Sequence, residues 1–502
     1  MNGILNAASE LVDPNVSKNP DKTAIYYRNE KISYGALQEG INRFGKLLAQ
    51  TGVRPGERLI IALPDSPAFF YAFLGSIRHG AWPVPLSPAL SRTGYDFIVQ
   101  DAGAVALVTR TDCSAAQASG STLRHRFYVD TPEYAAGITQ ASPELAPHPS
   151  RETDIAFMLY SSGSTGNPKG VPHRHRDMVA TADTYARQVL DATETDRFFS
   201  VAKLFFAFGL GNSLSFPLRA GASVILNPDP PTPPDILNMI GQYRPTLFFA
   251  VPTIYNMLLK TMETESLDTG ALRLCVSAGE ALPADLFHDW KRLTGVEILD
   301  GIGSTEALHI FLSNRAGQVR PGTSGTPVPG WETKVVDENG RAVPPGTLGR
   351  LWIRGDATAP HYWNRPEKTR ETMREEGWLD TGDVYIQTPG TEGAFVFQGR
   401  GDDMFKVDAN WVSPIRVEAV LREHPAVLEC AVSHRRLEGL AKPLALVVLR
   451  PGFEGNPKLV GTLRRHVLAN LPAYMCPVQI DFVQGLPKTE TGKVQRFRLK
   501  KD

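Results

Sequence analysis

The chain of 502 residues has few cysteines and no excess of either charge. Its four cysteines, Cys113, Cys275, Cys430 and Cys476, include no C-x-x-C pair and are too few for a disulfide framework in a chain of this length. Lys and Arg together number 53, as do Asp and Glu, so the formal net charge is zero. This balance excludes the strong basic field typical of nucleic-acid-binding proteins. We therefore expect a protein of the reducing cytoplasm that has no nucleic-acid partner.

The sequence also lacks a long uninterrupted apolar run. Its most apolar segment, residues 59–77, is broken by Pro64, Asp65, Ser66 and Pro67, leaving about ten consecutive apolar residues where a membrane-spanning helix needs roughly 20. Residues 1–15 show no positively charged start followed by an apolar stretch, so they do not resemble a signal peptide. We expect no membrane helix and no membrane partner.

What the chain does contain is a repeated pattern of short β-rich runs. The length predicts roughly three folding units of about 150 residues. Between residues 22 and 110 the runs TAIYY, LIIALP and ALVTR alternate with helix-like stretches such as Ser33 to Gln50. Between 154 and 300 the runs IAFMLY, ASVILN, PTLFFAVP and RLCVSAG do the same. Each region predicts an α/β layer, the second of them doubly wound, and residues 134–151, rich in Pro and Ala, predict a surface connection.

The pattern of predicted strands and helices changes towards the C-terminus. Residues 320–397 contain short strands split by turn signals such as Asn339-Gly340, which predicts a small β-barrel or β-subdomain. After Gly399, Ser413-Pro414 is typical of a helix start, and LALVVL predicts a buried strand. A second amphipathic helix is predicted from Leu459, Leu463, Val467 and Leu468. About 100 residues should thus form a C-terminal α+β domain.

The most informative segment is SSGSTGNPKG, residues 161–170, directly after the run IAFMLY. Its hydroxyl side chains, glycines and Lys169 predict a turn that surrounds phosphate oxygens with N–H groups, hydroxyls and an ammonium. It is not a Walker loop, because Pro168 stands where G-x-x-x-x-G-K-[ST] requires glycine. The alternative at this point is a flexible Ser/Gly surface turn.

Two acidic segments could complete a nucleotide site. DGIGSTE, residues 300–306, places Glu306 after an apolar pair, and a carboxylate beside a phosphate loop suits Mg²⁺. WLDTGD, residues 378–383, offers Asp383, whose carboxylate could accept hydrogen bonds from two ribose hydroxyls. Taken alone, an acid after a strand is more often a helix cap or a solvated side chain than a metal ligand.

Together and in this order, these segments resemble the adenylate-forming superfamily of acyl-CoA synthetases, adenylation domains and luciferases. The resemblance covers nearly the whole chain and rests on YSSGSTGNPKGVPH, LFFAFGLGN, VSAGEALP, DGIGSTE, GRLWIRG, WLDTGD, QGRGDDMFKV and LPKTETGK. Several stretches, AKLFFAFGLGN and WVSP among them, are more narrowly similar to benzoate-CoA ligases and ligases of substituted benzoates such as 2-aminobenzoate.

The resemblance implies a fold and a reaction. It implies an N-terminal AMP-binding domain over residues 1–399, made of two doubly wound α/β subdomains and a small β-barrel. A hinge at 400–403 and a mobile α+β C-terminal domain at 404–502 would follow. The implied enzyme activates an aromatic carboxylic acid with ATP and Mg²⁺ to an aryl-adenylate, then transfers the aroyl group to coenzyme A with release of AMP.

The resemblance also implies roles for individual residues. Lys493 would reach the carboxylate and the α-phosphate, Lys169 would hold the outer phosphates, and Asp402 would be the hinge residue. Thr305 would contact the α-phosphate, and Glu306 would help to hold Mg²⁺. The implied ATP- and AMP-binding residues are Ser161, Ser162, Gly163, Ser164, Thr165, Gly166, Gly279, Glu280, Ala281, Asp300, Gly301, Ile302, Thr305, Asp383 and Arg400. The implied acid pocket consists of Phe206, Ala207, Phe208, Ala278, Gly279, Gly303, His309 and Ile310.

Some alternatives stay open at this stage. His309 either hydrogen-bonds the acid or is a satisfied buried histidine. Asp408 and Ala409 stand where related CoA ligases carry glycine, so a carrier-protein phosphopantetheine is an alternative acceptor to CoA. A non-catalytic nucleotide-binding protein and a luciferase-like oxygenase are alternative functions, and a homodimer is an alternative to a monomer. The small residues Ala207 and Gly303 favour a flat ring over a long flexible chain.

Overall fold

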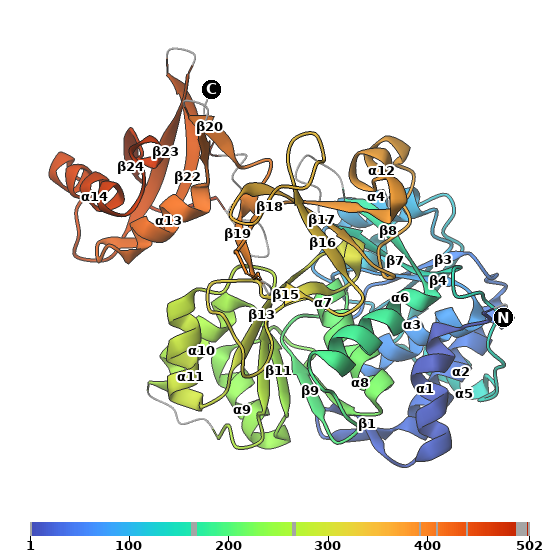
Figure 1. Cartoon of the computed structure of the whole chain (residues 1–502). Coiled ribbons are helices and arrows are strands. Elements are labelled where there is room, and N and C mark those ends of the chain that lie inside the picture. Colours follow the sequence, from blue (N-terminus) through green and yellow to red (C-terminus); the bar gives the residue numbers. More distant parts are fainter. Residues whose placement is uncertain are drawn as a thin grey trace. The chain divides into compact units, whose positions relative to one another are not determined.

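The computed structural model describes residues 3–161, 168–263, 268–390, 393–407, 410–437, 440–487 and 499. The chain forms two compact units. Unit 1 consists of Met1–Thr333, Trp352–Leu379 and Thr391–Phe395, and unit 2 of Lys334–Leu351, Asp380–Gly390 and Val396–Asp502. Figure 1 labels the elements along the chain.

A nine-stranded sheet runs through unit 1. Its order is β15 (Thr326–Pro327), β14 (Ile310–Ser313), β13 (Ile298–Gly303), β12 (Leu274–Ser277), β11 (Leu247–Ala250), β9 (Arg197–Ser200), β10 (Ser223–Leu226), β1 (Thr23–Tyr27) and β2 (Glu30–Ser33). The strands from β13 to β1 pair in parallel, and the pairs at both edges are antiparallel. Every residue of β10, β11 and β12 is buried, as expected for parallel strands covered on both faces.

Three amphipathic helices cover one part of this sheet: α9 (Pro233–Tyr243), α10 (Pro252–Met262) and α11 (Ala284–Thr294), which lie side by side in Figure 1. Helix α11 buries Leu286, Phe287 and Trp290, which fall on one face at helical spacing. It ends at Gly295, whose φ of 75° is the left-handed conformation that glycine adopts without strain. These side chains join Phe248 in the core between the helices and the sheet.

A second, four-stranded parallel sheet lies in the N-terminal part of unit 1. Its order is β4 (Trp82–Pro85), β3 (Arg58–Ile61), β5 (Ala106–Thr109) and β6 (His125–Tyr128). Around it are α2 (Tyr34–Thr51), α3 (Pro67–His79), α4 (Arg92–Ala102), η1 (Ser114–Gln117) and α5 (Pro132–Gln140). Helices α2 and α3 approach closely, because a Cβ on Gly75 would lie only 2.7 Å from the Ile41 carbonyl oxygen.

Unit 1 also contains helices outside these two groups. They are α1 (Ala7–Lys18), α6 (His175–Thr181), η2 (Ala182–Ala186), α7 (Ala207–Leu210), η3 (Gly211–Ser215), α8 (Phe216–Ala220), η4 (Thr305–Ala307), α12 (Pro366–Thr372) and η5 (Glu375–Gly377). The five-residue segments η2 and η3 are π-helical.

Three expectations about strand partners and connections were wrong. TAIYY, expected in the first layer, is β1 and pairs with β10 of the nine-stranded sheet. IAFMLY, expected in the second layer, lies in β7 (Ile155–Ser161) and pairs with β8 (Lys169–Arg174) in a separate two-stranded sheet. Residues 134–140, expected in a loop, belong to α5. An apolar run predicts that a strand is buried but does not say which strand it pairs with.

A four-stranded sheet occupies the region expected to be a β-subdomain, and its residues are divided between the units. Its strand order is β16 (Glu332–Val336), β17 (Leu348–Arg354), β18 (Leu379–Gln387) and β19 (Phe395–Arg400). Unit 2 continues with the hairpin of β20 (Phe405–Val407) and β21 (Asn410–Val412). Then follow α13 (Pro414–Glu423), β22 (Val427–Leu437), β23 (Leu440–Leu449), α14 (Pro457–Asn470), η6 (Ala473–Met475) and β24 (Gln479–Phe482).

The C-terminal helices begin largely as their sequence predicts. Ser413 caps α13 by accepting a hydrogen bond from the Arg416 N–H, and Pro414 is the first helical residue. Helix α14 buries Leu463 and Val467 against β22 and β23. Leu468, expected on the same face, is 48% exposed, because it follows Val467 by one residue and so points about 100° away.

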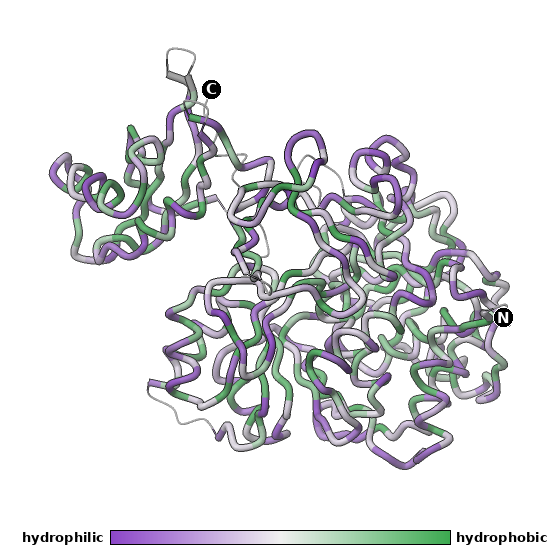
Figure 2. Tube along the Cα trace, viewed as in Figure 1, coloured by the Kyte–Doolittle hydropathy of each residue, from purple (hydrophilic) through white to green (hydrophobic). Residues whose placement is uncertain are grey.

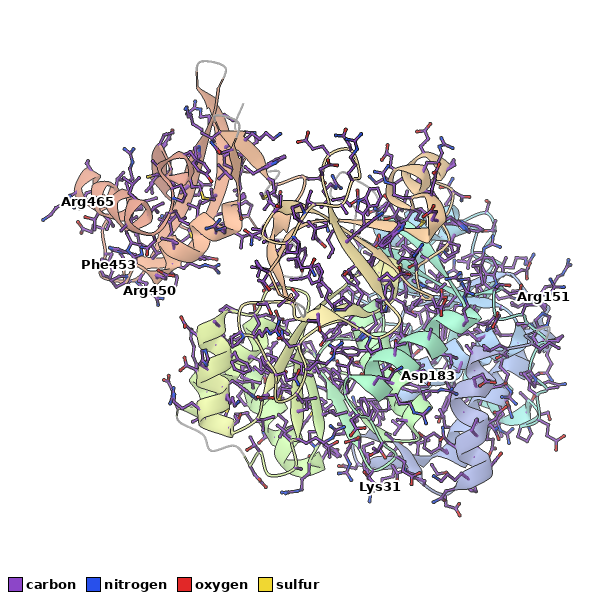
Figure 3. All side chains as sticks on the ribbon, in the orientation of Figure 1. Lys31, Arg151, Asp183, Arg450, Phe453 and Arg465 are labelled. Carbon is purple, nitrogen blue, oxygen red and sulfur yellow. The ribbon has the colours of Figure 1, made fainter. Side chains whose placement is uncertain are left out.

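No helix in the part of the chain that the structure describes is long and apolar enough to cross a membrane. In Figure 2 the apolar stretches are short and alternate with polar ones. Charged side chains project from both units in Figure 3, where Lys31, Asp183 and Arg465 are labelled. Asp183 forms an ion pair with Arg219 at 2.9 Å.

Candidate active site

The predicted phosphate loop connects two paired strands. Ser161 ends β7 and lies opposite Lys169, which begins β8, so residues 162–167 form the connection between them. The Ser161 hydroxyl is buried and has no hydrogen-bond partner among the described residues. Ser162, Gly163, Ser164, Thr165 and Gly166 lie outside the described residues. The hairpin therefore presents Ser161 and Lys169 at the two ends of the loop.

Lys169 and Glu306 come together on one aromatic side chain, Tyr362. The Lys169 ammonium lies 4.4 Å from the centroid of the Tyr362 ring. The Tyr362 hydroxyl donates a 2.7 Å hydrogen bond to Oε1 of Glu306. Tyr362 is only 3% exposed, and the following N–H, of Trp363, donates to the Gly170 carbonyl at 2.8 Å. Tyr362 lies in the motif HYWNRPEKT and is not among the residues predicted from the sequence.

The segment that carries Thr305 and Glu306 is held from two sides. It follows β13 as the short helix η4, capped by the Ser304 hydroxyl, which accepts from the Ala307 N–H. His173 of β8 is hydrogen-bonded through Nε2 to the Thr305 carbonyl at 2.9 Å. The Ala359 N–H donates to the Glu306 carbonyl at 2.8 Å. The hairpin of the phosphate loop and the DGIGSTE segment therefore form one site in unit 1.

The donor set fits a metal that is shared with a ligand. The described residues contain no group of three or more His, Cys, Asp or Glu side chains that could hold an ion by themselves. Glu306 offers a single carboxylate with one oxygen bound to Tyr362. Mg²⁺ is typically held by one or two carboxylates together with phosphate oxygens and water. Glu306 fits such an ion when the nucleotide supplies the other ligands.

The residues expected at the adenine follow β12 and lie in β13. Gly279 has a φ of 92°, and Gly279, Glu280 and Ala281 are exposed. Asp300 is buried, and its Oδ2 accepts from the Leu282 N–H at 3.3 Å. Its Oδ1 has no partner among the described residues. Burial raises the pKa of Asp300 well above its usual range, against the backbone hydrogen bonds from Leu282 and Gly301.

Gly301 and Ile302, the other expected adenine neighbours, continue β13 next to β14. A Cβ on Gly301 would lie 2.7 Å from the Leu312 carbonyl oxygen. The backbone therefore leaves no room for a side chain at position 301, which explains the first glycine of DGIG.

The residues expected at the acid differ in exposure, and Phe208 packs against His309. Phe206 precedes α7 and is 47% exposed, Ala207 and Phe208 are half-buried on α7, and Ala278 and Ile310 are buried. The Phe208 and His309 ring centroids are 5.5 Å apart. The residues expected at the acid thus come from α7, the end of β12 and the start of β14, three segments separated by about 70 and 30 residues of sequence.

His309 is a neutral imidazole held by a partner that sequence analysis missed. Its Nε2 is hydrogen-bonded to Asn212 Oδ1 at 3.1 Å, inside the π-helical η3. It is 2% exposed and packs against the rings of Tyr185 and Phe216. Burial lowers the pKa of His309 to about 3. Its Nδ1 has no hydrogen-bond partner among the described side chains, so both readings of this histidine keep support.

Gly303 is a poor position for testing the pocket. A Cβ there would lie 2.5 Å from the His309 carbonyl oxygen and 2.8 Å from the Ile310 nitrogen. Any side chain would displace the backbone of β14 before it could fill the pocket. Space for a ring is therefore better tested at Ala207.

The pair expected at the ribose lies in unit 2. Asp383 of β18 is buried and forms an ion pair with Arg400 of β19, at 2.9 Å between Oδ1 and Nη1. A Cβ on Gly382, whose φ is 76°, would lie 2.9 Å from Nη2 of Arg400. Asp402 is exposed in the turn 401–403 between β19 and β20. Lys493, Asp408 and Ala409 lie outside the described residues.

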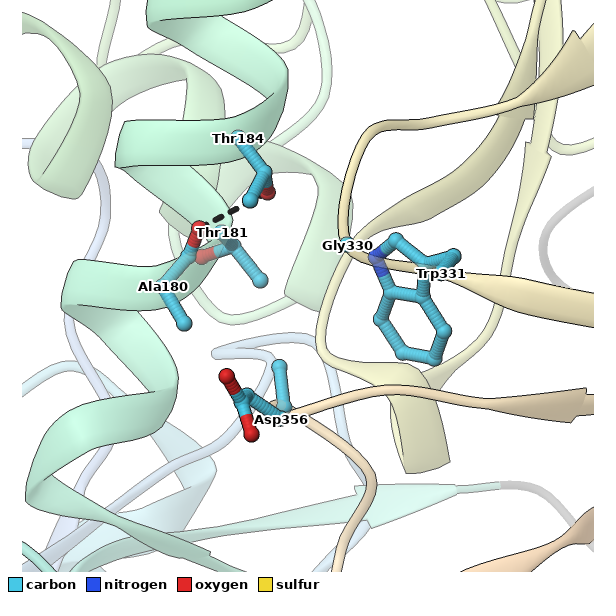
Figure 4. Close-up of a pocket in the computed structure, with 7 residues that line it drawn as sticks. Ala180, Thr181, Thr184, Gly330, Trp331 and Asp356 are labelled. Carbon is cyan, nitrogen blue, oxygen red and sulfur yellow. Dashed lines mark hydrogen bonds between the residues drawn. The ribbon is translucent and has the colours of Figure 1, made fainter.

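A further pocket in unit 1, shown in Figure 4, contains none of the predicted site residues. It is lined by Thr181, Thr184, Trp331 and Asp356 together with three small residues. Thr184 donates its hydroxyl hydrogen to the Ala180 carbonyl at 2.7 Å, and Thr181 does the same to carbonyls of α6. Because both hydroxyls already bond to their own helix, we assign no ligand to this pocket.

Two family models match this chain, and known proteins are similar to it over nearly its whole length. The family model described as AMP-binding enzyme matches residues 12–363, and that of the AMP-binding enzyme C-terminal domain matches residues 416–493. The benzoate–CoA ligase of Thauera aromatica is 41% identical over 99% of this chain and 95% of its own. The crystal structure of the anthranilate CoA ligase AuaEII in complex with anthranoyl-AMP superposes with a TM-score of 0.90 at 38% identity, covering 99% and 97% of the two chains. A benzoate CoA ligase from Burkholderia xenovorans LB400 gives a TM-score of 0.88 at 40% identity, covering 99% and 100%.

Proposed function

This chain belongs to the family of AMP-binding enzymes, and we propose that it is an ATP-dependent aryl-CoA ligase for benzoate or a small substituted benzoate such as 2-aminobenzoate. The observation that carries the proposal is the 41% identity with a benzoate–CoA ligase over 99% of the chain. The contact of Phe208 with His309 and the burial of Ala278 and Ile310 support an aromatic acid, because a flat ring offers apolar area and few hydrogen bonds.

The reaction has two steps. First, a carboxylate oxygen attacks the α-phosphorus of ATP, the bond between the α-phosphorus and the bridging oxygen breaks, and pyrophosphate leaves. Second, the sulfur of CoA attacks the acyl carbon of the aryl-adenylate, its proton is lost, and AMP leaves with the former carboxylate oxygen. No covalent bond to the enzyme is needed, so the protein acts by positioning and by stabilising charge on the phosphates.

The phosphate site of unit 1 serves the first step. We propose that Lys169, Ser161 and the connecting residues 162–166 hold the outer phosphates, and that Thr305 contacts the α-phosphate. Mg²⁺ held by Glu306 and the phosphate oxygens would supply positive charge where negative charge develops. The Tyr362 hydroxyl fixes the direction of the Glu306 carboxylate, and its ring keeps the Lys169 ammonium nearby.

We propose two sets of residues for the nucleoside half of ATP. Gly279, Glu280, Ala281 and the β13 residues 300–302 are the proposed neighbours of the adenine. Asp383, oriented by Arg400, is proposed to accept hydrogen bonds from the ribose hydroxyls. Lys493 is proposed to reach the carboxylate and the α-phosphate in the first step, with rotation about Asp402 between the two steps.

The domain boundaries 1–399, 400–403 and 404–502 stay part of this proposal, as do a cytoplasmic location and a homodimer. An alternative acceptor is the phosphopantetheine of a carrier protein, supported by Asp408 and Ala409 at positions where related CoA ligases carry glycine.

The test is ATP–pyrophosphate exchange with a panel of aromatic and aliphatic acids, repeated as product formation with CoA. We expect benzoate or a ring-substituted benzoate to support exchange far better than octanoate, whose flexible chain loses more entropy on binding. We expect free CoA to discharge the adenylate as the thioester. Exchange with aliphatic acids alone would overturn the aromatic substrate, and an adenylate that resists CoA but loads a phosphopantetheinylated carrier protein would favour the alternative acceptor.

A further inference from the structure

A buried ion pair lies beside the acid pocket and has no role in the proposed chemistry. Lys203 belongs to the connection between β9 and α7, and its side chain is 16% exposed. Its ammonium donates hydrogen bonds to the carbonyls of Asn227, at 2.6 Å, and Asp229, at 2.9 Å. Both carbonyls follow β10, so Lys203 ties its segment to the strand next to β9 in the nine-stranded sheet.

The other half of the pair comes from the four-stranded sheet. Asp65 follows β3 and is only 2% exposed. Its Oδ1 accepts a 3.0 Å hydrogen bond from the Leu204 N–H, and its Oδ2 lies 4.0 Å from the Lys203 ammonium. Asp65 and Lys203 together therefore hold residues 203–204 between elements of two different sheets.

The cost of burying the two charges argues against a role of this pair in stabilising the fold. Burial raises the pKa of Asp65 to about 6, although Lys203 and the Leu204 N–H act in the opposite direction. Burial also lowers the pKa of Lys203, against the attraction of Asp65 and Asp229. For both residues the effect of burial on the pKa is larger than the opposing effect of the partner's charge. A buried ion pair of this kind often stabilises a fold no more than apolar side chains of similar size would.

The segment held by the pair leads directly into the acid pocket. The Phe206 N–H donates to the Lys203 carbonyl at 3.0 Å, which closes the turn before α7. A Cβ on Gly209 would lie only 2.0 Å from the same carbonyl oxygen, so α7 packs directly on the backbone of Lys203. A shift at residue 203 is therefore passed on to Phe206, Ala207 and Phe208.

We propose that Asp65 and Lys203 are positioning residues for the carboxylic acid, which hold the 203–208 segment so that Phe206, Ala207 and Phe208 form one wall of the acid pocket. The inference rests on the proposed function for the location of the pocket. Neither side chain needs to touch the acid, because both act through the backbone of the segment they hold. The pair should thus control binding of the acid and leave binding of ATP alone.

The test compares three single variants and one double variant with the full-length wild type. Lys203→Met removes the ammonium and keeps the length of the side chain. Asp65→Asn removes the charge but keeps an oxygen for the Leu204 N–H. Arg273→Met is the matched control, because Arg273 pairs with the buried Asp196 at the opposite ends of the strands, at 2.8 Å. For each protein we would measure KM for the acid, KM for ATP, the exchange rate at saturation, and Tm.

We expect Lys203→Met to raise KM for the acid about tenfold, the size of effect typical of a misplaced binding wall. KM for ATP should not change. Asp65→Asn should act in the same direction but more weakly, and the double variant should be no worse than Lys203→Met, because both residues act on one segment. Arg273→Met should lower Tm without changing KM for the acid.

A parallel rise in both KM values, or a lower Tm with unchanged KM for the acid, would overturn the inference. Should Lys203→Met fail to fold, Asp65→Asn decides the question by the same comparison of KM values. All variants are assayed with whichever acid the wild type prefers in the panel. A wild type that prefers an aliphatic acid would thus refute the proposed function, whereas a pair that does not affect the preferred acid would refute only the positioning role.

Discussion

Buried carboxylates at the two ends of the parallel strands in unit 1 have opposite environments. Asp196, just before β9, accepts hydrogen bonds from Arg273, from the Thr246 hydroxyl at 2.7 Å and from the Thr193 N–H at 2.8 Å. Burial alone would raise its pKa, but these hydrogen bonds hold the pKa below its usual range. Asp300, near the carboxyl ends of β12 and β13, accepts a 3.3 Å hydrogen bond from the Leu282 N–H, and burial raises its pKa.

The difference separates residues that hold the fold from residues that are available to a ligand. At the amino ends every acceptor of Asp196 is used within the protein. At the carboxyl ends Asp300 Oδ1, the Ser277 hydroxyl and His309 Nδ1 are buried and have no partner among the described residues. Ligands of open α/β sheets bind outside the carboxyl ends of the strands, where unused hydrogen-bonding groups are expected. Variants at the two ends should therefore fail in different ways.

The largest effect is expected for Lys493→Ala, at a residue proposed to contact the reacting atoms. Loss of one group that stabilises developing charge typically slows a reaction by about 100- to 1,000-fold. Adenylate formation, measured by pyrophosphate exchange, should fall by this factor, while thioester formation from supplied aryl-adenylate and CoA continues. Lys458→Ala, an exposed lysine of α14, is the control. Equal losses in both half-reactions would refute the role of Lys493.

At the amino end, Arg273→Met should cost stability instead of activity. Removing the guanidinium leaves the buried Asp196 carboxylate with fewer donors, which should lower the free energy of unfolding by about 2 kcal/mol, below the usual range for a buried pair because Arg273 is partly exposed. Urea denaturation would measure the loss. Kinetic constants of the folded variant should match those of the wild type; a raised KM for the acid would abolish the distinction between the two ends.

Tyr362→Phe should change the response to magnesium. The variant keeps the ring beside Lys169 but loses the hydroxyl that orients Glu306. We expect about a tenfold rise in the Mg²⁺ concentration needed for half-maximal exchange, and weaker calorimetric binding of MgATP, in line with the loss of one hydrogen bond to a charged group.

The matched control for this prediction is Tyr34→Phe. It also removes a buried hydroxyl with a 2.7 Å hydrogen bond, here to the Ala222 carbonyl, and Tyr34 does not contact Glu306. An identical magnesium response in the two variants would show that the Tyr362 hydroxyl has no part in metal binding.

The smallest effect concerns pH. The pKa of Asp65 is raised to about 6 in the folded chain, so its stabilising protonated form is lost as the pH rises through that value. The free energy of unfolding of Asp65→Asn relative to wild type should therefore increase by about 1 kcal/mol between pH 5 and pH 8.

Asp196 provides the comparison. Its lowered pKa keeps it ionised in both the folded and the unfolded chain over this range, so stability that depends on its charge is lost only at more acidic pH. Asp196→Asn should thus show the same difference from wild type at pH 5 and pH 8. A flat profile for Asp65→Asn as well would mean that Asp65 does not titrate as its burial implies.

Much of the fold was predictable because it depends on local patterns. The Ser413-Pro414 helix start, the helix over 34–51 and the buried run LALVVL all follow from residues that are neighbours in sequence. The pairing of TAIYY with β10 was not predictable in this way, since its partner lies about 200 residues later and any buried strand would show the same apolar pattern. Leu468 is a second example of an apolar residue whose environment the sequence did not predict, because it was expected on the buried face of α14 and is exposed.

The sequence by itself determined the motifs of the candidate site, namely the Ser/Gly/Lys segment between β7 and β8 and the acidic DGIGSTE segment, and the family that these motifs identify. Only the tertiary structure decided which side chains support that chemistry. Tyr362 meets Glu306 across 56 positions of sequence, and Asp65 meets Leu204 across 139. The motifs can be recognised in the sequence because their functional groups are close together in the chain. The supporting contacts form only when folding brings distant segments together and removes the water that would otherwise hydrogen-bond to their polar groups.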